Sequence, residues 1–390
     1  MKFCGIICEF NPLTNGHLYF INQAKELSGL NVLALMSGNF TQRGEMAVLN
    51  KFERAKQAIN AGCFAVLELP TCYAVSPAEN FAFGAIKALN EIGSVTHIAF
   101  GIETNNPNNL TKIAQFLSSP PQNYTASLQN KLKQGKNYHF SQIETLKEFF
   151  DEIIINDCFS GANNILAIEY LKAIIKLHAN LSPIFIKRCD NGFNSQECIE
   201  SFLGATTIRK KLKNKEDVSN FVPESELSTL LNATTQSDGF SNFMLYNLRT
   251  KTPKELQNYY DYSEGIEYLI SKNAISQNNI NNLIQQCISK RYRESRINRL
   301  ILYPTLNLTK KLYNQISHKT STIKLLAIKT TNKQNIKYLT CGRAKIIITN
   351  QDYKNANSPS LKLDLFASNI YYAFNQQPHN LDLITGTLFM

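Results

Sequence analysis

Short apolar runs and longer amphipathic stretches alternate along the first 200 residues of the chain. The apolar runs cover residues 4–9, 32–37, 65–70, 97–102 and 184–187. Apolar positions with helical spacing cover residues 18–27, 51–61, 78–92 and 165–177. Short, continuously apolar runs are typical of strands buried on both faces, and their alternation with helices predicts a Rossmann-like, doubly wound α/β fold with a parallel sheet. In such folds, ligands bind beyond the carboxyl ends of the strands.

The pattern changes near residue 204. Helical spacing then dominates, notably over residues 225–231 and 279–302, and short β-like runs follow at 323–329 and 344–349. At roughly 100–200 residues per domain, a chain of 390 residues suggests two or three domains. We therefore predict an α/β domain over residues 1–204, a helical basic domain over 205–310, and a small α+β domain over 311–390.

The net charge of +11 is concentrated in the second half of the chain. Residues 201–390 carry 25 of the 41 Lys and Arg residues but only 13 of the 30 Asp and Glu residues. A basic half joined to a nearly neutral half indicates a polyanionic partner for the second half. The alternative is a genomic bias toward Lys and Asn, although such a bias should act on both halves equally.

The distribution of cysteines and apolar residues bears on the cellular compartment. Nine cysteines are scattered with no CxxC pair and no Cys/His cluster, which favours reduced thiols over a disulfide framework or a zinc site. No apolar run approaches the roughly 18–20 residues of a membrane span. The first apolar run is also too short for a signal peptide, so we expect a cytoplasmic protein without a membrane anchor.

A polar loop joins the first predicted strand to the first predicted helix. Residues 8–18 have the sequence Cys-Glu-Phe-Asn-Pro-Leu-Thr-Asn-Gly-His-Leu. Backbone N–H groups and the helix dipole favour a phosphate at such a helix N-terminus. Gly16 allows a close approach of the ligand, His17 can donate an imidazole N–H, and Thr14 can add a hydroxyl.

This loop lacks both the GxxxxGK[ST] pattern and the GxGxxG pattern. Its Thr-Asn-Gly-His sequence at residues 14–17 instead matches the motif of the nucleotidyltransferases, a relative of the HIGH motif of class I tRNA synthetases. The alternative is an ordinary helix N-terminus that is capped by Thr14 or Asn15.

Further distinctive segments follow the other predicted strands. They lie at residues 36–45, 68–79 and 100–103, while residues 163–166 open a helix and Arg188 ends the fifth strand. Each segment alone could be a turn or a helix cap. Because the carboxyl ends of parallel strands share one edge of the sheet, the set as a whole indicates a binding site there.

Together these segments resemble the bacterial tRNA(Met) cytidine acetate ligase family of the HIGH-motif nucleotidyltransferase superfamily. The family pattern has counterparts at residues 9–18, 36–45, 68–79, 100–103, 163–170, 186–188 and 205–210. The resemblance implies an enzyme that uses ATP, with Mg²⁺ expected, to convert acetate to an acetyl-adenylate. The acetyl group would then pass to N4 of the wobble cytidine of elongator tRNA(Met), giving N4-acetylcytidine.

The resemblance also implies which residues carry this chemistry. His17, Thr14 and Arg209 would be catalytic, and no protein-held metal is implied. The ATP-binding set would comprise Ile7, Cys8, Glu9, Phe10, Asn11, Pro12, Leu13, Thr14, Asn15, Gly16, His17, Leu18, Tyr19, Phe20, Gly101, Asn163, Arg188 and Thr206. Two positions depart from the family: Thr14 replaces a His, and Gly204 replaces a Ser of the phosphate-binding segment. Neither departure predicts loss of activity.

Two basic clusters of the second half are candidates for RNA binding. They comprise Lys210, Lys211, Arg291, Arg293, Arg296 and Arg299. In a continuous helix, Tyr292, Arg296 and Arg299 would share one face, and basic residues interleaved with Tyr suit contacts with RNA phosphates and bases. A solvated helix face is the alternative for either cluster.

Two other functions remain open at the level of sequence. One is a small-molecule adenylyltransferase, which would seldom carry so long a basic extension. The other is a non-catalytic RNA-binding protein with a vestigial nucleotide site, against which the retained His17, Asn163 and Arg209 argue. The sequence identifies neither the acetate pocket nor the oligomeric state.

Overall fold

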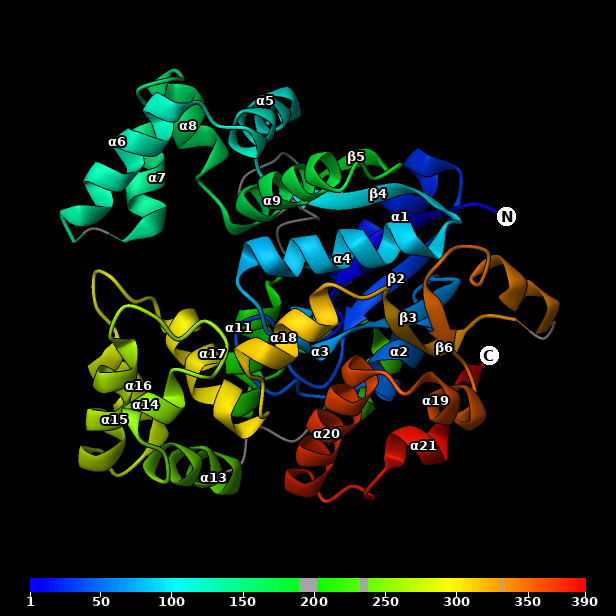
Figure 1. Ribbon diagram of the computed structural model, residues 1–390. Helices are drawn as coiled ribbons and strands as arrows, with labels where there is room; N and C mark the ends of the chain where they lie inside the picture. The colour runs from blue at the N-terminus through cyan, green and yellow to red at the C-terminus, as the bar shows by residue number, and fades with distance from the viewer. Residues whose placement is uncertain (136, 189–201, 232–237, 331–332) are drawn as a thin grey trace.

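The protein is built around one mixed β-sheet with helices on both faces (Figure 1). The structure, a computed structural model, describes residues 1–135, 137–188, 202–231, 238–330 and 333–390. The strands within these residues are β1 (Phe3–Cys8), β2 (Asn31–Ser37), β3 (Ala65–Leu69), β4 (Val95–Ile102), β5 (Ser182–Lys187), β6 (Thr322–Ile328), β7 (Lys345–Ile347) and β8 (Leu388–Phe389). Their order is β5-β4-β1-β2-β3-β6-β7, and β8 pairs with β6. Strands β1 to β5 are parallel, which confirms the predicted fold class.

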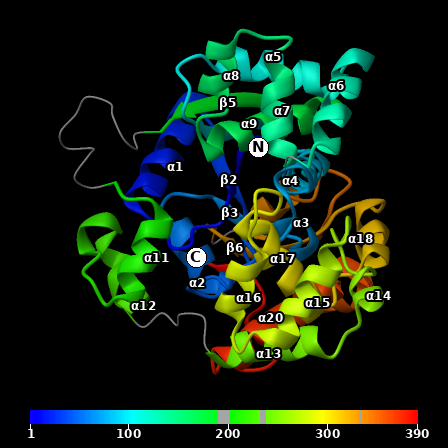
Figure 2. The ribbon, with the colours of Figure 1, turned by 90° about the vertical axis from the view of Figure 1, so that its left-hand side faces the viewer.

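Both faces of the sheet are buried, which explains the uninterrupted apolar runs. Alternate residues of β1 belong to two different cores: Phe3 packs in the core that includes α4 and α9, and Cys4 and Ile6 pack in the core that includes α1 and α2. Figure 2 shows α1 on one side of the sheet and α4 on the other. The helices of this part are α1 (Asn15–Ser28), α2 (Lys51–Asn60), α3 (Thr71–Ala74), α4 (Ala78–Ile92), α5 (Pro107–Ser118), α6 (Gln122–Lys133), α7 (Tyr138–Leu146), α8 (Glu152–Cys158) and α9 (Ala162–Lys176).

The described residues between 202 and 317 are helical, as the spacing predicts. Their helices are α11 (Ala205–Lys213), η1 (Ser219–Phe221), α12 (Glu224–Leu231), α13 (Asp238–Arg249), α14 (Pro253–Leu256), α15 (Ile266–Ser276), α16 (Ile280–Cys287), α17 (Glu294–Thr305) and α18 (Lys310–Ser317). The C-terminal part adds η2 (Lys333–Tyr338), α19 (Asn350–Ala356), α20 (Pro359–Phe374) and α21 (Leu381–Thr385). None of the helices in the described part of the chain has the length and apolar character that crossing a membrane requires.

One predicted helical segment, residues 279–302, is in fact two helices. Helix α16 ends at Cys287, and α17 begins at Glu294 after an extended residue, Arg293. Between them, the Ser289 hydroxyl accepts the N–H groups of Arg291 and Tyr292, and this turn competes with helix continuation. Tyr292 therefore does not share a helix face with the arginines of α17, contrary to the prediction.

The C-terminal region shares the sheet of the N-terminal region. Strand β6 pairs antiparallel with β3, with Ala65 opposite Ile328 and Val66 opposite Ala327. The sheet therefore does not end at the predicted domain boundary near residue 310. The division into three domains stays a prediction, whereas the joined sheet is a finding that local sequence patterns could not provide.

A buried ionic cluster fastens this late addition to the sheet. The Lys51 ammonium, which is fully buried, lies 2.7 Å from Glu68 Oε1 and 2.5 Å from Asp382 Oδ2. Lys324 of β6 donates to the carbonyl of Asp382 at 2.5 Å. Burial alone would lower the pKa of Lys51, but the two carboxylates outweigh burial and hold that pKa above its ordinary value.

Asp364 of α20 is a second buried carboxyl group near this cluster, and its Oδ1 accepts the Thr71 N–H at 2.7 Å. Burial and the nearby Glu68 raise the pKa of Asp364 to about 7. The folded protein therefore keeps a proton on Asp364 that the unfolded chain loses, so this group's contribution to stability is lost as pH rises from about 4 to about 7.

We predict that Asp364→Asn stabilises the protein at about pH 8 by up to about 4 kcal/mol and has little effect at about pH 4. Urea denaturation at the two pH values measures this difference. Asp352→Asn is the control, and it should destabilise the protein at about pH 8. Burial would raise the pKa of Asp352, but hydrogen bonds, chiefly from the Thr349 amide and hydroxyl, outweigh burial and lower that pKa. Equal stability of Asp364→Asn and the unsubstituted protein at about pH 8 would contradict the prediction.

Candidate active site

A cavity of about 450 Å³ lies at the carboxyl ends of β1, β4 and β5. Strand β1 has β2 on one side and β4 on the other, so the chain leaves β1 in one direction and returns later on the opposite side. Such a reversal of strand order is where doubly wound sheets bind ligands. The structure thus places the cavity where the sequence predicts it.

Three helix N-termini line this cavity. They are those of α1, through Thr14 and Gly16, of α9, through Ala162 and Asn163, and of α11, through residues 204–206. Each helix N-terminus carries a partial positive charge. At α9, the Glu103 carboxylate already accepts the N–H groups of Asn163 and Asn164, so that terminus does not offer these two N–H groups to a ligand. The convergence of the three termini on one cavity favours a ligand with several negative charges.

A buried arginine holds the loops that follow β1 and β2. Arg54 of α2 is fully buried, and its Nη1 donates to the carbonyl oxygens of Glu9 at 2.6 Å and Ser37 at 3.1 Å. Its Nε donates to Leu49 O at 3.0 Å. Both strand ends are therefore fixed against α2 before any ligand binds.

The imidazole of His17 is oriented by the cap of its own helix. Thr14 is the N-cap residue: its hydroxyl accepts the His17 N–H, while its own N–H donates to His17 Nδ1 at 3.1 Å. Because Nδ1 accepts this hydrogen bond, the proton of the neutral ring lies on Nε2. His17 also lines the cavity, so its ring offers an Nε2–H donor beside the N-terminus of α1.

Gly16 has no steric need to be glycine in the protein alone. A Cβ at this position would meet only Thr14 Oγ1, at 3.6 Å. The open space next to Gly16 belongs to the cavity, which fits a phosphate group that approaches the backbone closely.

Glu9 is a partly buried carboxylate that lines the cavity. Its Oε1 accepts the Gln42 N–H at 2.7 Å. Burial raises the pKa of Glu9, and this effect is opposed by the Gln42 hydrogen bond and by Arg54, Arg209 and Arg43. Glu9 therefore balances part of the positive charge that surrounds the cavity.

Gly101, Asn163 and Arg188, the predicted adenosine contacts, line the cavity together. A Cβ at Gly101 would lie 3.3 Å from Arg188 Cγ, so the Arg188 stem packs over the glycine. Arg188 Nη1 donates to Asn163 Oδ1 at 3.3 Å. Glu103, the first residue after β4, accepts the backbone N–H groups of Asn163 and Asn164, at 3.1 Å and 2.7 Å.

Helix α11 is joined to the first loop by Arg209. Its Nη1 donates to Asn11 O at 2.9 Å, and its Nη2 lies 3.4 Å from Thr206 Oγ1 and 3.5 Å from Glu45 Oε2. Gly204 is the N-cap of α11 and makes no side-chain cap, and a Cβ there would meet nothing within 4 Å. A serine would fit at this position, so the departure at Gly204 removes a hydroxyl without altering the fold.

The profile of the HIGH Nucleotidyl Transferase family matches residues 1–383. This chain belongs to that family. A tRNA(Met) cytidine acetate ligase from Caldanaerobacter subterraneus subsp. tengcongensis is 38% identical over 383 residues, covering 95% of each chain. The protein of the same name from Clostridium acetobutylicum is 32% identical over 399 residues, covering 98% of each.

A solved structure shows the same architecture over the full length of both chains. It is Thermotoga maritima TmcAL bound with alpha-thio ATP, which is 27% identical and superposes with a TM-score of 0.90. Its apo form gives the same score. The strand that joins the sheet late in the chain is therefore part of a shared fold.

Most of the predicted ATP-binding residues of this family member line the cavity. Among residues 7–20, those that line it are Ile7, Cys8, Glu9, Phe10, Asn11, Thr14, Gly16, His17, Tyr19 and Phe20. Gly101, Asn163, Arg188, Thr206 and Arg209 line it too. Pro12, Leu13, Asn15 and Leu18 do not. Leu13 is buried in the core beneath α1, and the Asn15 amide donates to Asn220 O at 3.0 Å, so both shape the loop from outside the cavity.

The cavity has an aromatic wall that the sequence pattern does not predict. Phe81, Phe100 and Tyr170 line it, together with Gln42 and Arg43 of the segment after β2. Four of these five lie inside the quoted segments, but nothing in a linear pattern separates a core aromatic from one that faces a ligand. Of these five residues, Arg43 is the exposed one.

The predicted RNA-binding residues occupy three kinds of environment: the exposed surface, contact with a carboxylate and, for Arg299, the protein interior. Lys210 and Arg293 are exposed. Arg291 and Arg296 face acidic partners, with Arg291 3.0 Å from Glu264 and Arg296 3.4 Å from Asp261. Lys211 is 2.8 Å from Glu216.

Arg299 occupies a different environment from the other arginines of its cluster. It is 6% exposed, and its Nη1 donates to Gln42 O at 3.1 Å. Gly44, with a φ of 79°, packs against the Arg299 backbone, where a Cβ would come within 2.7 Å. Arg299 therefore positions the loop after β2 and is not part of an exposed basic surface.

The cysteines of the described residues are reduced thiols, as expected. The seven described cysteines are free, and burial raises the pKa of Cys4 to about 11 and that of Cys63 to about 12. Thiols held neutral in this way are poor nucleophiles. Cys189 and Cys198 lie outside the described residues.

Proposed function

We propose that this protein is an ATP-dependent ligase that activates acetate as acetyl-adenylate. It then transfers the acetyl group to N4 of the wobble cytidine of elongator tRNA(Met). The observation that carries the proposal is the convergence of three helix N-termini on a cavity that His17 lines. The names of the relatives and the alpha-thio ATP of the structural neighbour support it.

In the first step, an acetate oxygen attacks the α-phosphorus, and the bond from that phosphorus to the pyrophosphate oxygen breaks. Acetate is ionised near neutral pH, so no general base is required. What the protein must supply is stabilisation of negative charge in fixed positions. His17 Nε2–H suits the α-phosphate, while Thr206 and Arg209 on α11 suit the departing pyrophosphate.

In the second step, the cytidine N4 attacks the acetyl carbonyl carbon, the bond to the AMP oxygen breaks, and N4 loses a proton. The adenosine would lie at Gly101, Asn163 and Arg188, where the Arg188 stem already covers the glycine. With the adenosine there, Phe81 and Tyr170 would be available to contact nonpolar groups of the substrates.

Mg²⁺ would reach the site with the triphosphate. The described residues include no group of three or more His, Cys, Asp or Glu side chains placed to hold a metal ion. Mg²⁺ commonly takes its ligands from substrate phosphates and water, and it would neutralise charge on the leaving pyrophosphate.

The test of the proposal is incubation of the protein with tRNA, ATP and labelled acetate, followed by nucleoside analysis. We expect labelled N4-acetylcytidine without acetyl-CoA, and acetate-dependent exchange of pyrophosphate into ATP when tRNA is absent. A requirement for acetyl-CoA would exclude the adenylate. Nucleotide transfer to a small molecule with no labelled tRNA would indicate an adenylyltransferase instead.

We further propose that the exposed basic residues Lys210 and Arg293 contact tRNA phosphates. Arg293→Glu should weaken tRNA binding about tenfold and leave pyrophosphate exchange unchanged, and binding should fall steeply with salt. Arg296 is a poorer test, because a carboxylate there would face Asp261. Lys2→Glu is the control, since it makes the same charge change at the amino end of β1. Equal binding by both variants, or a flat salt response, would contradict this role.

A further inference from the structure

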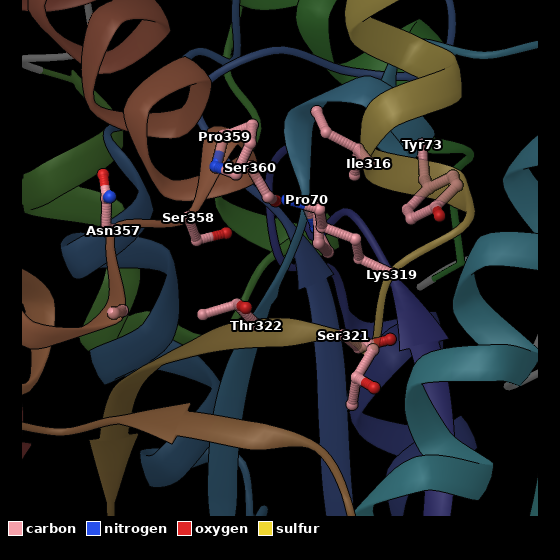
Figure 3. Close-up of a pocket in the computed structure, with 12 residues that line it drawn as sticks. Pro70, Tyr73, Ile316, Lys319, Ser321, Thr322, Asn357, Ser358, Pro359 and Ser360 are labelled. Atoms are coloured by element: carbon pink, nitrogen blue, oxygen red, sulfur yellow. The ribbon is translucent and has the colours of Figure 1, made fainter.

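A second, smaller cavity lies at the same edge of the sheet as the candidate active site, but over β3 and β6. Its volume is about 110 Å³, against roughly 10–15 Å³ for the smallest cavity that holds one water. Figure 3 shows that its walls come from four places: Pro70 and Tyr73 near α3, Ile316 and the turn after α18, Thr322 at the start of β6, and the N-terminus of α20. None of the residues that line it lines the larger cavity.

Two buried hydroxyl groups of this pocket lack hydrogen-bond partners. Ser360 and Ser321 are 4% and 7% exposed, and neither Oγ atom has a partner in the described structure. Both residues line the pocket, and in Figure 3 the Ser360 hydroxyl lies between α20 and Pro70. A buried hydroxyl without a partner costs about 1–3 kcal/mol, so a ligand that accepts from both would remove a penalty already present.

The N-terminus of α20 adds donors and positive potential. This helix has 16 residues, its N-cap residue Ser358 makes no side-chain cap, and Pro359 occupies the first helical turn. Ser358 and Ser360 both line the pocket. Asp364, one turn further along, is engaged with the Thr71 amide and is not among the lining residues.

The opposite wall carries a cation on a rigid support. Lys319 lines the pocket and is exposed. Its turn is held from α4, where Lys87 Nζ donates to the carbonyl oxygens of Ser317 and Lys319 at 2.7 Å and 2.6 Å. Glu91 Oε2 accepts the Ser321 N–H at 2.7 Å. The pocket is therefore preformed on both sides.

We propose that this pocket binds a phosphate group. Hydroxyls from Ser358, Ser360, Ser321 and Thr322 surround it, with a helix N-terminus on one side and a lysine on the other. Several donors on different walls match the acceptor oxygens of a tetrahedral phosphate better than the two oxygens of a carboxylate. The phosphate is either a free ion or part of an RNA backbone, and the proposal does not depend on the function assigned to the larger cavity.

The location is tested by soaking crystals of the full chain with tungstate, which scatters anomalously. We expect a peak between Ser360 and Lys319. Inorganic phosphate should also bind in solution and raise the thermal midpoint. Water alone in the pocket of soaked crystals, or a peak only in the larger cavity, would overturn the proposal.

Matched variants test which residues bind the phosphate. Lys319→Glu should reduce the affinity for inorganic phosphate at least tenfold, and Lys311→Glu, an exposed position on the same α18 segment, less than twofold. Ser360→Ala should raise the thermal midpoint without phosphate and reduce phosphate affinity severalfold, because it removes an unpaired hydroxyl. A hydroxyl that is merely structural would lower the midpoint and leave phosphate affinity unchanged, and that result would overturn the proposal, as would equal affinities of the two lysine variants.

The source of the phosphate is resolved by competition. If unmodified tRNA displaces inorganic phosphate from the unsubstituted protein but not from a Lys319→Glu variant at matched occupancy, the natural ligand is an RNA phosphate. If phosphate remains bound in the presence of saturating tRNA, the natural ligand is a free ion. Both results support the site, and failure of phosphate and tRNA alike to bind there contradicts it.

Discussion

His17→Ala should lower the rate of acetyl-adenylate formation by about 10²–10³. The ring lines the cavity, and Thr14 fixes it with Nδ1 as acceptor and Nε2 as donor. A donor held in place contributes most when charge develops at the α-phosphorus, so the loss should appear in kcat more than in the KM for ATP. Acetate-dependent ATP–pyrophosphate exchange measures this step without tRNA.

His17→Gln is the matched control for this variant, because its amide N–H can reach toward the position of Nε2. It should recover part of the lost rate. The alanine variant also loses one hydrogen bond of the α1 cap, worth about 1 kcal/mol, so urea denaturation must accompany the kinetics. Unchanged exchange in a folded His17→Ala protein would remove the phosphate from its proposed place beside α1.

Lys51→Met should destabilise the protein by about 3–5 kcal/mol, because it leaves Glu68 and Asp382 buried with their main cation removed. Lys324 compensates only in part, since its Nζ donates to the carbonyl oxygen of Asp382 and lies 3.7 Å from Asp382 Oδ2. The measurement is chemical denaturation near neutral pH, or the soluble yield if the variant does not fold.

Lys56→Met is the control for that prediction, since Lys56 is an exposed residue of the same helix. It should change stability by no more than about 0.5 kcal/mol. A Lys51→Met protein as stable as this control would show that the ionic cluster does not fasten the C-terminal region to the sheet.

The basic surface is smaller than the charge count of the second half suggests. Arg291 and Arg296 are each within 3.4 Å of a carboxylate, and Arg299 is buried against the loop after β2. A count of cations measures net charge, whereas the electrostatic potential depends on which cations lack nearby carboxylates. Lys210 and Arg293 are therefore the sharper candidates for RNA contact.

The parallel sheet, its first five strands and the position of the cavity follow from local patterns along the chain. Strand and helix periods are local, and the Thr14–His17 cap lies within one helical turn, so no distant contact is needed to recognise them. The family resemblance rested on segments that the sheet gathers at one edge, and the relatives and family profile confirm it.

The way in which the late segments pack is visible only in the folded protein. The addition of β6 to β3, the contact of Arg209 with Asn11, and the burial of Arg299 each join residues about 200 or more positions apart. A periodic pattern shows which face of an element is apolar but does not identify its partner, because many surfaces can bury the same face. The aromatic wall, the ionic cluster and the second pocket all depend on such pairings.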